Sequence, residues 1–210
     1  MSIVVRAVSL LLNTYNRDTC SFWSIRINVH DSEPGVAQDA SHEPLQTSAT
    51  TMELRKLNID DVPDLWAINE EGLPGVGQVS EAQMADLLSL CEHPIGAIIG
   101  GELAGFVLCL RPRTRYGSLN YAWFNERYDH FLYVDRIAVA ARFRDNRVGT
   151  VLYEQVIALA QREDLPIAAE VSLEPPNPGS MRFHGRHGFD EVGILEHGDK
   201  AVTMMMRSAG

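Results

Sequence analysis

The chain has 210 residues, of which 45% are hydrophobic and 22% are charged, and it carries 18 Lys and Arg against 28 Asp and Glu, a net charge of −10. This composition is typical of a globular protein and excludes a collagen-like fibre, a coiled coil and a mostly disordered chain. The acidic balance disfavours nucleic acid and anionic membranes as partners.

Cysteine and hydropathy patterns indicate a protein of the cytoplasm. Cys20, Cys91 and Cys109 are odd in number, widely spaced and without a CxxC pair, which fits a reducing compartment. No apolar run in the sequence approaches the roughly 18 residues that span a bilayer. Ile3–Leu12 is short, contains Arg6 and lacks a following small-residue cleavage site, so we do not expect a secretory leader.

The composition changes near residue 50. From Asp31 to Thr51 almost no large apolar residue occurs, so this stretch cannot bury enough surface to offset its ordering entropy. We therefore predict an N-terminal extension over residues 1–51, disordered or non-native, with Met52 as a hypothetical native start. Ile3–Val29 keeps the pattern of one or two strands without an obvious partner. Residues 52–208 are predicted to form one domain.

From Glu53 onward, strand and helix patterns alternate, which indicates an α/β or α+β architecture with a mixed sheet. Asp60 and Asp61 are expected to cap the first helix, and Ser80 the second. Residues 111–130 are polar and irregular, yet rich in aromatic side chains. The remaining predicted elements are strands at 53–57, 95–99, 102–110, 131–139, 167–173, 189–195 and 201–207, and helices at 80–91, 147–162 and 177–187.

The most informative stretch is the strand at 131–139 with the turn and helix that follow it. A helix start presents unpaired N–H groups and the positive end of a dipole, which suits a pyrophosphate. Gly149 lets the backbone approach an anion, Thr150 adds a hydroxyl donor, and Arg144 and Arg147 add positive charge. An ordinary strand–helix junction with solvated arginines would contain the same residues.

A second stretch, Asn177–Phe189, follows a strand by a few residues. Together the two stretches resemble the GNAT superfamily of acyl-CoA-dependent N-acetyltransferases. The Arg/Gln-x-x-Gly-x-Gly/Ala motif of that family is matched at the first and last positions of Arg144–Gly149, where Arg147 replaces the middle glycine. Its later motif is matched at Asn177, Ser180, Phe183, Gly188 and Phe189, with His184 in place of a tyrosine.

The resemblance implies the fold class and the cofactor. We expect an α/β (α+β mixed) fold with a mostly antiparallel sheet of six to seven strands, splayed at the cofactor site and flanked by about four helices. The strand ending at Val139 would pair with the pantetheine arm of acetyl-CoA, and the following turn would hold the pyrophosphate. The cofactor-binding residues implied are Ile137, Ala138, Val139, Arg144, Asp145, Asn146, Arg147, Val148, Gly149, Thr150, Asn177 and Phe183.

The resemblance also implies direct attack of an amine on the thioester in a ternary complex. His184 would protonate the departing thiolate, or it would only pack beside the cofactor. Asp135 is the first candidate for the general base and Glu126 the second, although Asp135 could equally pair with Arg136. His184 and His187 lie three apart, but spacing supplies no third ligand, so no metal is expected.

The acceptor side has candidates of two kinds. Glu70 and Glu71 could attract a cationic amine or simply end a solvated helix, whereas the aromatic residues and Glu126 could wall the acceptor pocket or pack within their loop. The substrate-binding candidates are Glu70, Glu71, Tyr121, Trp123 and Glu126. We expect acetyl transfer to a small-molecule amine, with a protein amine as the alternative.

Two rival functions come from other classes. A non-catalytic acyl-CoA sensor or interaction module would keep the cofactor site while departing from the family at Arg147 and His184. A nucleotide-binding α/β protein would use the same turn for a different phosphate. Members of the family commonly form dimers, so the resemblance leaves a homodimer open, with no interface specified by the sequence.

Overall fold

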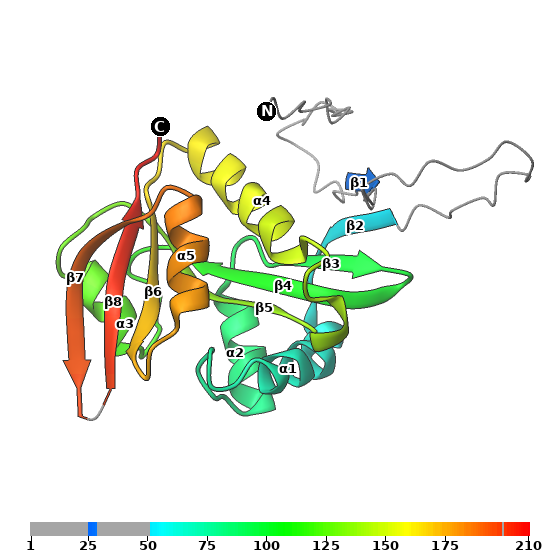
Figure 1. Cartoon of the computed structure of the whole chain (residues 1–210), viewed down its shortest axis with the longest axis horizontal. Coiled ribbons are helices and arrows are strands. Elements are labelled where there is room, and N and C mark those ends of the chain that lie inside the picture. The colour runs from blue at the N-terminus through cyan, green and yellow to red at the C-terminus, as the bar shows by residue number, and fades with distance from the viewer. Residues whose placement is uncertain (1–24, 29–50, 199) are drawn as a thin grey trace, which may run out of the picture.

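The computed structural model describes residues 25–28, 51–198 and 200–210, which form one mixed β-sheet with helices on both faces (Figure 1). The described strands follow the order β1-β2-β3-β4-β5-β6-β8-β7. Neighbouring strands are antiparallel, except that β5 and β6 are parallel. The strands are β1 (Ile25–Asn28), β2 (Thr51–Lys56), β3 (Ile95–Ile99), β4 (Glu102–Leu110), β5 (Leu132–Val139), β6 (Ile167–Glu174), β7 (Asp190–His197) and β8 (Lys200–Arg207).

Five α-helices occur in the described part of the chain. Helices α1, α2 and α3 pack on one face of the sheet, and α4 and α5 pack on the other, so each face has its own apolar cluster. The helices are α1 (Val62–Glu71), α2 (Glu81–Leu90), α3 (Leu119–Asn125), α4 (Val148–Arg162) and α5 (Pro178–Arg186). The mixed, mostly antiparallel sheet predicted from the sequence is confirmed, and β2 to β8 supply the expected six to seven strands.

Helix ends follow local side-chain chemistry. Ser80 and Gln83 form a capping box at the start of α2, as the sequence predicts for Ser80. Asp61 occupies the N-cap position of α1, as expected, but its side chain makes no capping hydrogen bond to that helix, and Asp60 is not its cap. Asn58 caps the short 3-10 turn before α1 instead, and the Asp61 carboxylate accepts hydrogen bonds from the Asn58 N–H and from Arg55.

Helix α3 corrects the expectation that residues 111–130 are irregular. The Ser118 hydroxyl accepts a hydrogen bond from the Tyr121 N–H, and Tyr121 and Phe124 are buried against the sheet. A seven-residue helix has little intrinsic stability, so tertiary packing of these aromatic rings decides its conformation. Its hydrophobic pattern is too short to be recognised by periodicity.

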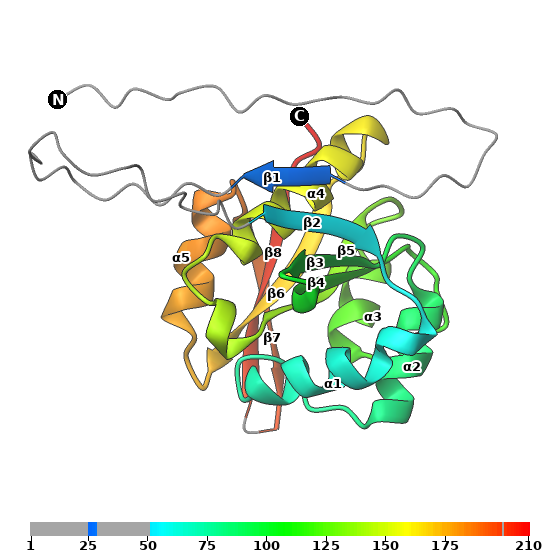
Figure 2. The same ribbon diagram turned by 90° about the vertical axis from the view of Figure 1, so that its right-hand side faces the viewer.

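Strand β1 lies in the segment predicted to be an extension. It pairs antiparallel with β2, from Ile25 opposite Leu54 to Asn28 opposite Thr51, and the two strands run side by side in Figure 2. The strand pattern expected before Val29 therefore has a partner in β2. The other expectations for residues 1–50 lie outside the described residues.

The sheet opens between β5 and β6. Their described pairing comprises Leu132 opposite Ile167 and Tyr133 opposite Ala168, after which the strands diverge. Figure 1 shows β6, β8 and β7 turned strongly away from β4 and β5. The splay that the family resemblance implies is therefore present, at the strands expected.

A β-bulge interrupts β5 just after the splay begins. Cys109 pairs with Val134 and Leu108 with Arg136, so Asp135 is an extra residue without a partner position on β4. A bulge bends the strand and re-aims its side chains. Asp135 thus lies where β5 turns away from β6.

Close packing of β4 against β5 and α4 makes Gly105 intolerant of substitution. A Cβ there would lie 2.8 Å from the Ala138 carbonyl oxygen and 2.9 Å from Val148 Cγ1. We expect Gly105→Ala to lower the free energy of unfolding by about 1–3 kcal/mol. Urea denaturation measures this change. Gly117→Ala is the control because a Cβ there meets nothing within 4 Å; equal stability of the two variants would contradict the packing argument.

Candidate active site

The open edge of β5 is the first part of the site. Beyond Tyr133 no described strand pairs with β5 on its β6 side, so its backbone polar groups need another partner. The side chains of Ile137 and Val139 pack against the cluster that includes α4 and α5. An extended ligand lying in the splay could complete this edge as an added strand would.

The turn between β5 and α4 is the second part. Asp145 and Arg147 have positive φ angles of 67° and 58°, and among the described residues no side chain caps α4. The first N–H groups of the helix therefore point out of the turn. Next to them, a Cβ on Gly149 would lie 3.8 Å from Val139 and 3.9 Å from Phe183. Glycine is thus not required by protein packing, and it leaves the backbone accessible to a ligand.

Glu71 joins α1 to this turn. Its carboxylate accepts a hydrogen bond of 2.6 Å from the Ala141 N–H, and its carbonyl oxygen accepts one of 2.9 Å from Arg144. Arg142 pairs with Glu102 at 2.5 Å. The structure therefore places Glu71, a predicted acceptor-binding residue, against the predicted cofactor turn.

Helix α5 brings two more predicted cofactor residues to the splay. The Asn177 side chain caps the helix by accepting a hydrogen bond of 3.0 Å from the Ser180 N–H. A Cβ on Gly75 would lie 3.5 Å from Asn177, so the α1–α2 loop passes close to the start of α5. Phe183 stacks on His187 with ring centres 4.2 Å apart and lies beside Gly149.

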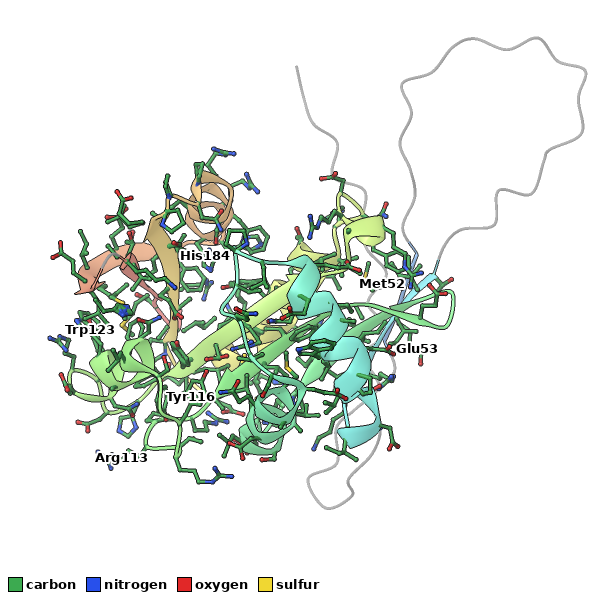
Figure 3. The ribbon with its side chains drawn as sticks, turned by 90° about the horizontal axis from the view of Figure 1, so that it is seen from below. Met52, Glu53, Arg113, Tyr116, Trp123 and His184 are labelled. Carbon is green, nitrogen blue, oxygen red and sulfur yellow. The ribbon has the colours of Figure 1, made fainter. Side chains whose placement is uncertain are left out.

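His184 lies inside the α4–α5 packing and is 4% exposed. Its Nε2 is 2.6 Å from the Tyr153 hydroxyl and its Nδ1 is 2.9 Å from the Ser180 carbonyl oxygen. A carbonyl oxygen can only accept, so Nδ1 carries the proton and Nε2 accepts from Tyr153. Burial lowers the pKa of His184, which favours the neutral ring. Figure 3 shows His184 on α5, apart from Tyr116 and Trp123, which pack on the side of the sheet that carries α1, α2 and α3.

Asp135 forms a buried ion pair on the opposite face. Its carboxylate is 2.8 Å from Arg136 Nε, and the two side chains are 4% and 6% exposed. Arg136 also donates to Asn69 Oδ1 at 2.9 Å and to the Gly77 carbonyl oxygen at 3.4 Å. The expected alternative, in which Asp135 pairs with Arg136, is therefore present alongside its position at the bulge.

Glu170 on β6 is the residue that sequence reasoning missed. Two positions beyond the Tyr133–Ala168 pair, each strand carries a carboxylate, so Glu170 faces Asp135 across the splay. Burial raises the pKa of Glu170 to about 7, and the nearby negative charge of Asp135 adds to this effect. A lone glutamate in the otherwise apolar segment 167–171 was the available signal.

The remaining acceptor candidates are dispersed. Tyr121 is buried, and its hydroxyl bonds to Arg111 and Thr114. Trp123 packs on β7, where a Cβ on Gly193 would approach it to 2.7 Å. Glu126 is exposed beside Arg127. For Glu70, Oε1 is buried and has no hydrogen-bond partner among the described residues.

Comparison with known proteins identifies the family. The model of the acetyltransferase (GNAT) family matches residues 62–189, which include the splay, the turn and α5. The chain belongs to the GNAT acetyltransferase family. It is therefore an acyltransferase, as the resemblance of its two motifs implies. Among curated proteins, no sequence matches this chain.

Solved GNAT structures share the fold at low sequence identity. Ard1 from Thermoplasma volcanium is 18% identical, with a TM-score of 0.61 over 75% of this chain and 97% of that chain. The ribosomal-protein-S18-alanine N-acetyltransferase from Escherichia coli is 16% identical, with a TM-score of 0.59 over 75% and 94%. Arabidopsis thaliana Naa50, in complex with the bisubstrate analogue CoA-Ac-MVNAL, is 15% identical, with a TM-score of 0.58 over 75% and 98%.

Two further features concern the described residues of this GNAT protein. Their helices are too short or too polar to cross a bilayer. They also contain no group of three His, Cys, Asp or Glu side chains arranged to hold a metal ion.

Gly149 provides a test of the cofactor turn. Because a Cβ there makes only ordinary contacts, we expect Gly149→Ala to keep its thermal stability. The added methyl would block the approach of the pyrophosphate, so acetyl-CoA affinity should fall at least about tenfold, or about 1.4 kcal/mol. Calorimetric titration measures the affinity. Gly185→Ala on α5, where a Cβ also has free space, should bind as the wild type does; equal binding by both variants would place the pyrophosphate elsewhere.

His184 should make stability depend on pH. The unfolded chain takes up a proton near pH 6.5, whereas the lowered pKa of the folded His184 delays uptake, so protons favour unfolding. The contribution of the neutral, buried His184 ring to the free energy of unfolding is fully present above about pH 6.5 and is lost as the pH falls below it. We therefore expect the stability advantage of wild type over His184→Gln to shrink from pH 7 to pH 5. Urea titrations at each pH measure it; parallel stability curves would refute the neutral, buried ring.

Proposed function

We propose that this protein transfers an acetyl group from acetyl-CoA to the primary amine of a small molecule. The observation that carries the proposal is the two-residue pairing of β5 with β6, which leaves a strand edge open beside an uncapped helix start. The edge suits an extended pantetheine arm, and the helix start suits a pyrophosphate. We also retain the cytoplasm as the expected compartment.

Different cofactor residues would bind different parts of acetyl-CoA. The backbone of Ile137–Val139 would bind the pantetheine arm, and the N–H groups of residues 145–150 would bind the pyrophosphate, with Arg144 and Arg147 adding charge. Val139 and Phe183 flank Gly149, where the backbone stays accessible. When bound, acetyl-CoA supplies a thioester that is already activated toward an amine.

Glu170 is the proposed general base. An amine reaches the enzyme mostly as an ammonium ion, and it must lose a proton before it can attack the thioester. A carboxylate with a pKa of about 7 is half deprotonated at neutral pH and is a strong enough base to accept that proton. Asp135, the first candidate base from the sequence, is ion-paired with Arg136, so we assign it the role of setting the charge around Glu170.

His184 is a poor proton donor for the leaving thiolate in this geometry, because its only ring proton bonds to the Ser180 carbonyl oxygen. We therefore propose that the thiolate leaves without a proton from His184. The role of His184 would then be to hold α5 against α4 through Tyr153. A direct proton donation by His184 stays the alternative.

We infer a compact acceptor because contacts hold the segments on both sides of the proposed acceptor site. On one side, the α1–α2 loop is tied down by hydrogen bonds of 3.2 Å from Asn69 to the Gly77 carbonyl oxygen and of 3.0 Å from Trp66 to the Val79 carbonyl oxygen. On the other side, α3 is anchored on β7 by Trp123. A protein N-terminus is the second candidate, because the Escherichia coli structure carries the name of a protein-alanine N-acetyltransferase.

The activity test follows free thiol released from acetyl-CoA in the presence of small amines and of short peptides. We expect wild type to respond to small amines, with a kcat/KM that rises with pH about a midpoint near 7. Glu170→Gln should lower kcat by about 10²–10⁴-fold, because it removes a general base, and should leave acetyl-CoA binding intact. Glu174 is exposed at the end of the same strand, so Glu174→Gln should keep the kcat of wild type.

Each alternative has its own signature. Release stimulated only by peptides would favour a protein acceptor. Acetyl-CoA binding without thiol release from any acceptor would favour a sensor. Stabilisation by ATP or NAD but not by acetyl-CoA would favour a nucleotide-binding protein. Full activity of Glu170→Gln would exclude Glu170 as the base and return Asp135 to first place.

A further inference from the structure

The Glu170 carboxylate is held from two directions. Tyr133 on β5 donates a hydrogen bond of 2.8 Å to its Oε2, and Asn120 on α3 donates one of 3.0 Å to its Oε1. Tyr133 lies on the strand paired with β6, whereas Asn120 lies on a helix between β4 and β5. Each carboxylate oxygen thus has one protein donor.

A purely structural contact does not explain the asparagine at position 120, because its side chain has a buried polar atom without a partner among the described residues. Its Nδ2 reaches Glu170, but its Oδ1 is buried and accepts no hydrogen bond within the described part of the chain. A buried, unpartnered polar atom costs free energy, which an apolar residue at this position would avoid. The amide is therefore better explained by what its N–H does for the carboxylate than by packing.

Resting on the proposed function, we propose that Asn120 and Tyr133 are positioning residues that fix Glu170 in its basic, ionised form beside the acceptor amine. Hydrogen bonds donated to a carboxylate stabilise its charged form. They also fix the direction of its remaining lone pairs. Helix α3, through Asn120, would then contribute to the chemistry of the site as well as to its wall.

The electrostatic surroundings of Glu170 are mixed. Asp135 opposes its ionisation, and Arg136, Tyr133 and Asn120 favour it. Tyr116 reaches the pair formed by Asp135 and Arg136 and does not bond to Glu170. The residue paired with Glu170 on β8 is the apolar Met204. Burial and Glu170 raise the pKa of Tyr133, so its hydroxyl stays a donor.

The test is the pH dependence of kcat/KM in variants that remove one donor each. Tyr133→Phe removes only a hydroxyl, and Asn120→Leu replaces the amide by an apolar group of similar size. Each should move the midpoint upward from about 7. A shift of about one unit would lower activity at pH 7 about fivefold, and raising the pH to 9 would restore it. Asn120→Asp puts a negative charge next to the Glu170 carboxylate, which opposes its ionisation, so this variant should shift the midpoint furthest.

The control variant lies on the same helix. Leu119 is 63% exposed, and Leu119→Ala should keep the wild-type midpoint. Because folding stability itself falls at low pH, the activity at each pH is divided by the folded fraction measured at that pH, and the midpoint is taken from the corrected profile. Unchanged midpoints in both Asn120→Leu and Tyr133→Phe, or an equal shift in Leu119→Ala, would overturn the proposal.

A measurement without turnover separates this proposal from the proposed function. The carboxyl carbon of Glu170, labelled with ¹³C, reports its own titration by NMR. We expect a midpoint near 7 in wild type and higher midpoints in the Asn120 and Tyr133 variants. These shifts in a protein that releases no thiol would refute acetyl transfer and leave the positioning roles in place; identical titrations would refute the positioning roles.

Discussion

The short pairing between β5 and β6 is the constraint on which the rest of the site depends. Two adjacent parallel strands normally satisfy each other along their length, yet here the described pairing ends at Tyr133 and Ala168. The bulge at Asp135 then turns β5 away, which leaves backbone donors and acceptors facing the gap. The divergence also places the start of α4 at the far end of this edge. The early end of the β5–β6 pairing thus places the open edge of β5 and the start of α4 next to each other.

The same divergence sets the charges of the two carboxylates that face each other across it. The buried Arg136 lies close enough to neutralise one of them, and it bonds directly to Asp135. The hydrogen-bond donors to Glu170 among the described residues, Tyr133 and Asn120, are both neutral, and burial and the charge of Asp135 act against its ionisation. Because Arg136 bonds to Asp135 and not to Glu170, Asp135 is an ion-pair partner, whereas Glu170 is left as a titratable group.

The sequence predicted the elements that have long periodic patterns or strong end signals. The Ser80 cap, helix α4 and the central strands all form as expected, because local chemistry decides them. Helix α3 and the position of Glu71 could not be predicted. The conformation of α3 depends on aromatic packing, and Glu71 reaches a turn 70 residues further along the chain. Glu170 was overlooked because its importance arises from the strand opposite it.

The two departures from the family motifs differ in their physical consequences. Arg147 stands where the motif has glycine and adopts the left-handed conformation that favours glycine, at φ 58°. That conformation costs a non-glycine residue about 1–3 kcal/mol, yet it preserves the path of the turn. His184 replaces a tyrosine and turns into the α4–α5 packing, where its ring bonds to Tyr153. The first substitution keeps the backbone geometry of the motif and adds a charge, whereas the second places a buried ring where the motif has a hydroxyl. The change at residue 147 therefore leaves the shape of the turn suited to a phosphate, while the buried ring of His184 is the reason for our proposal that Glu170, across the splay, accepts the proton.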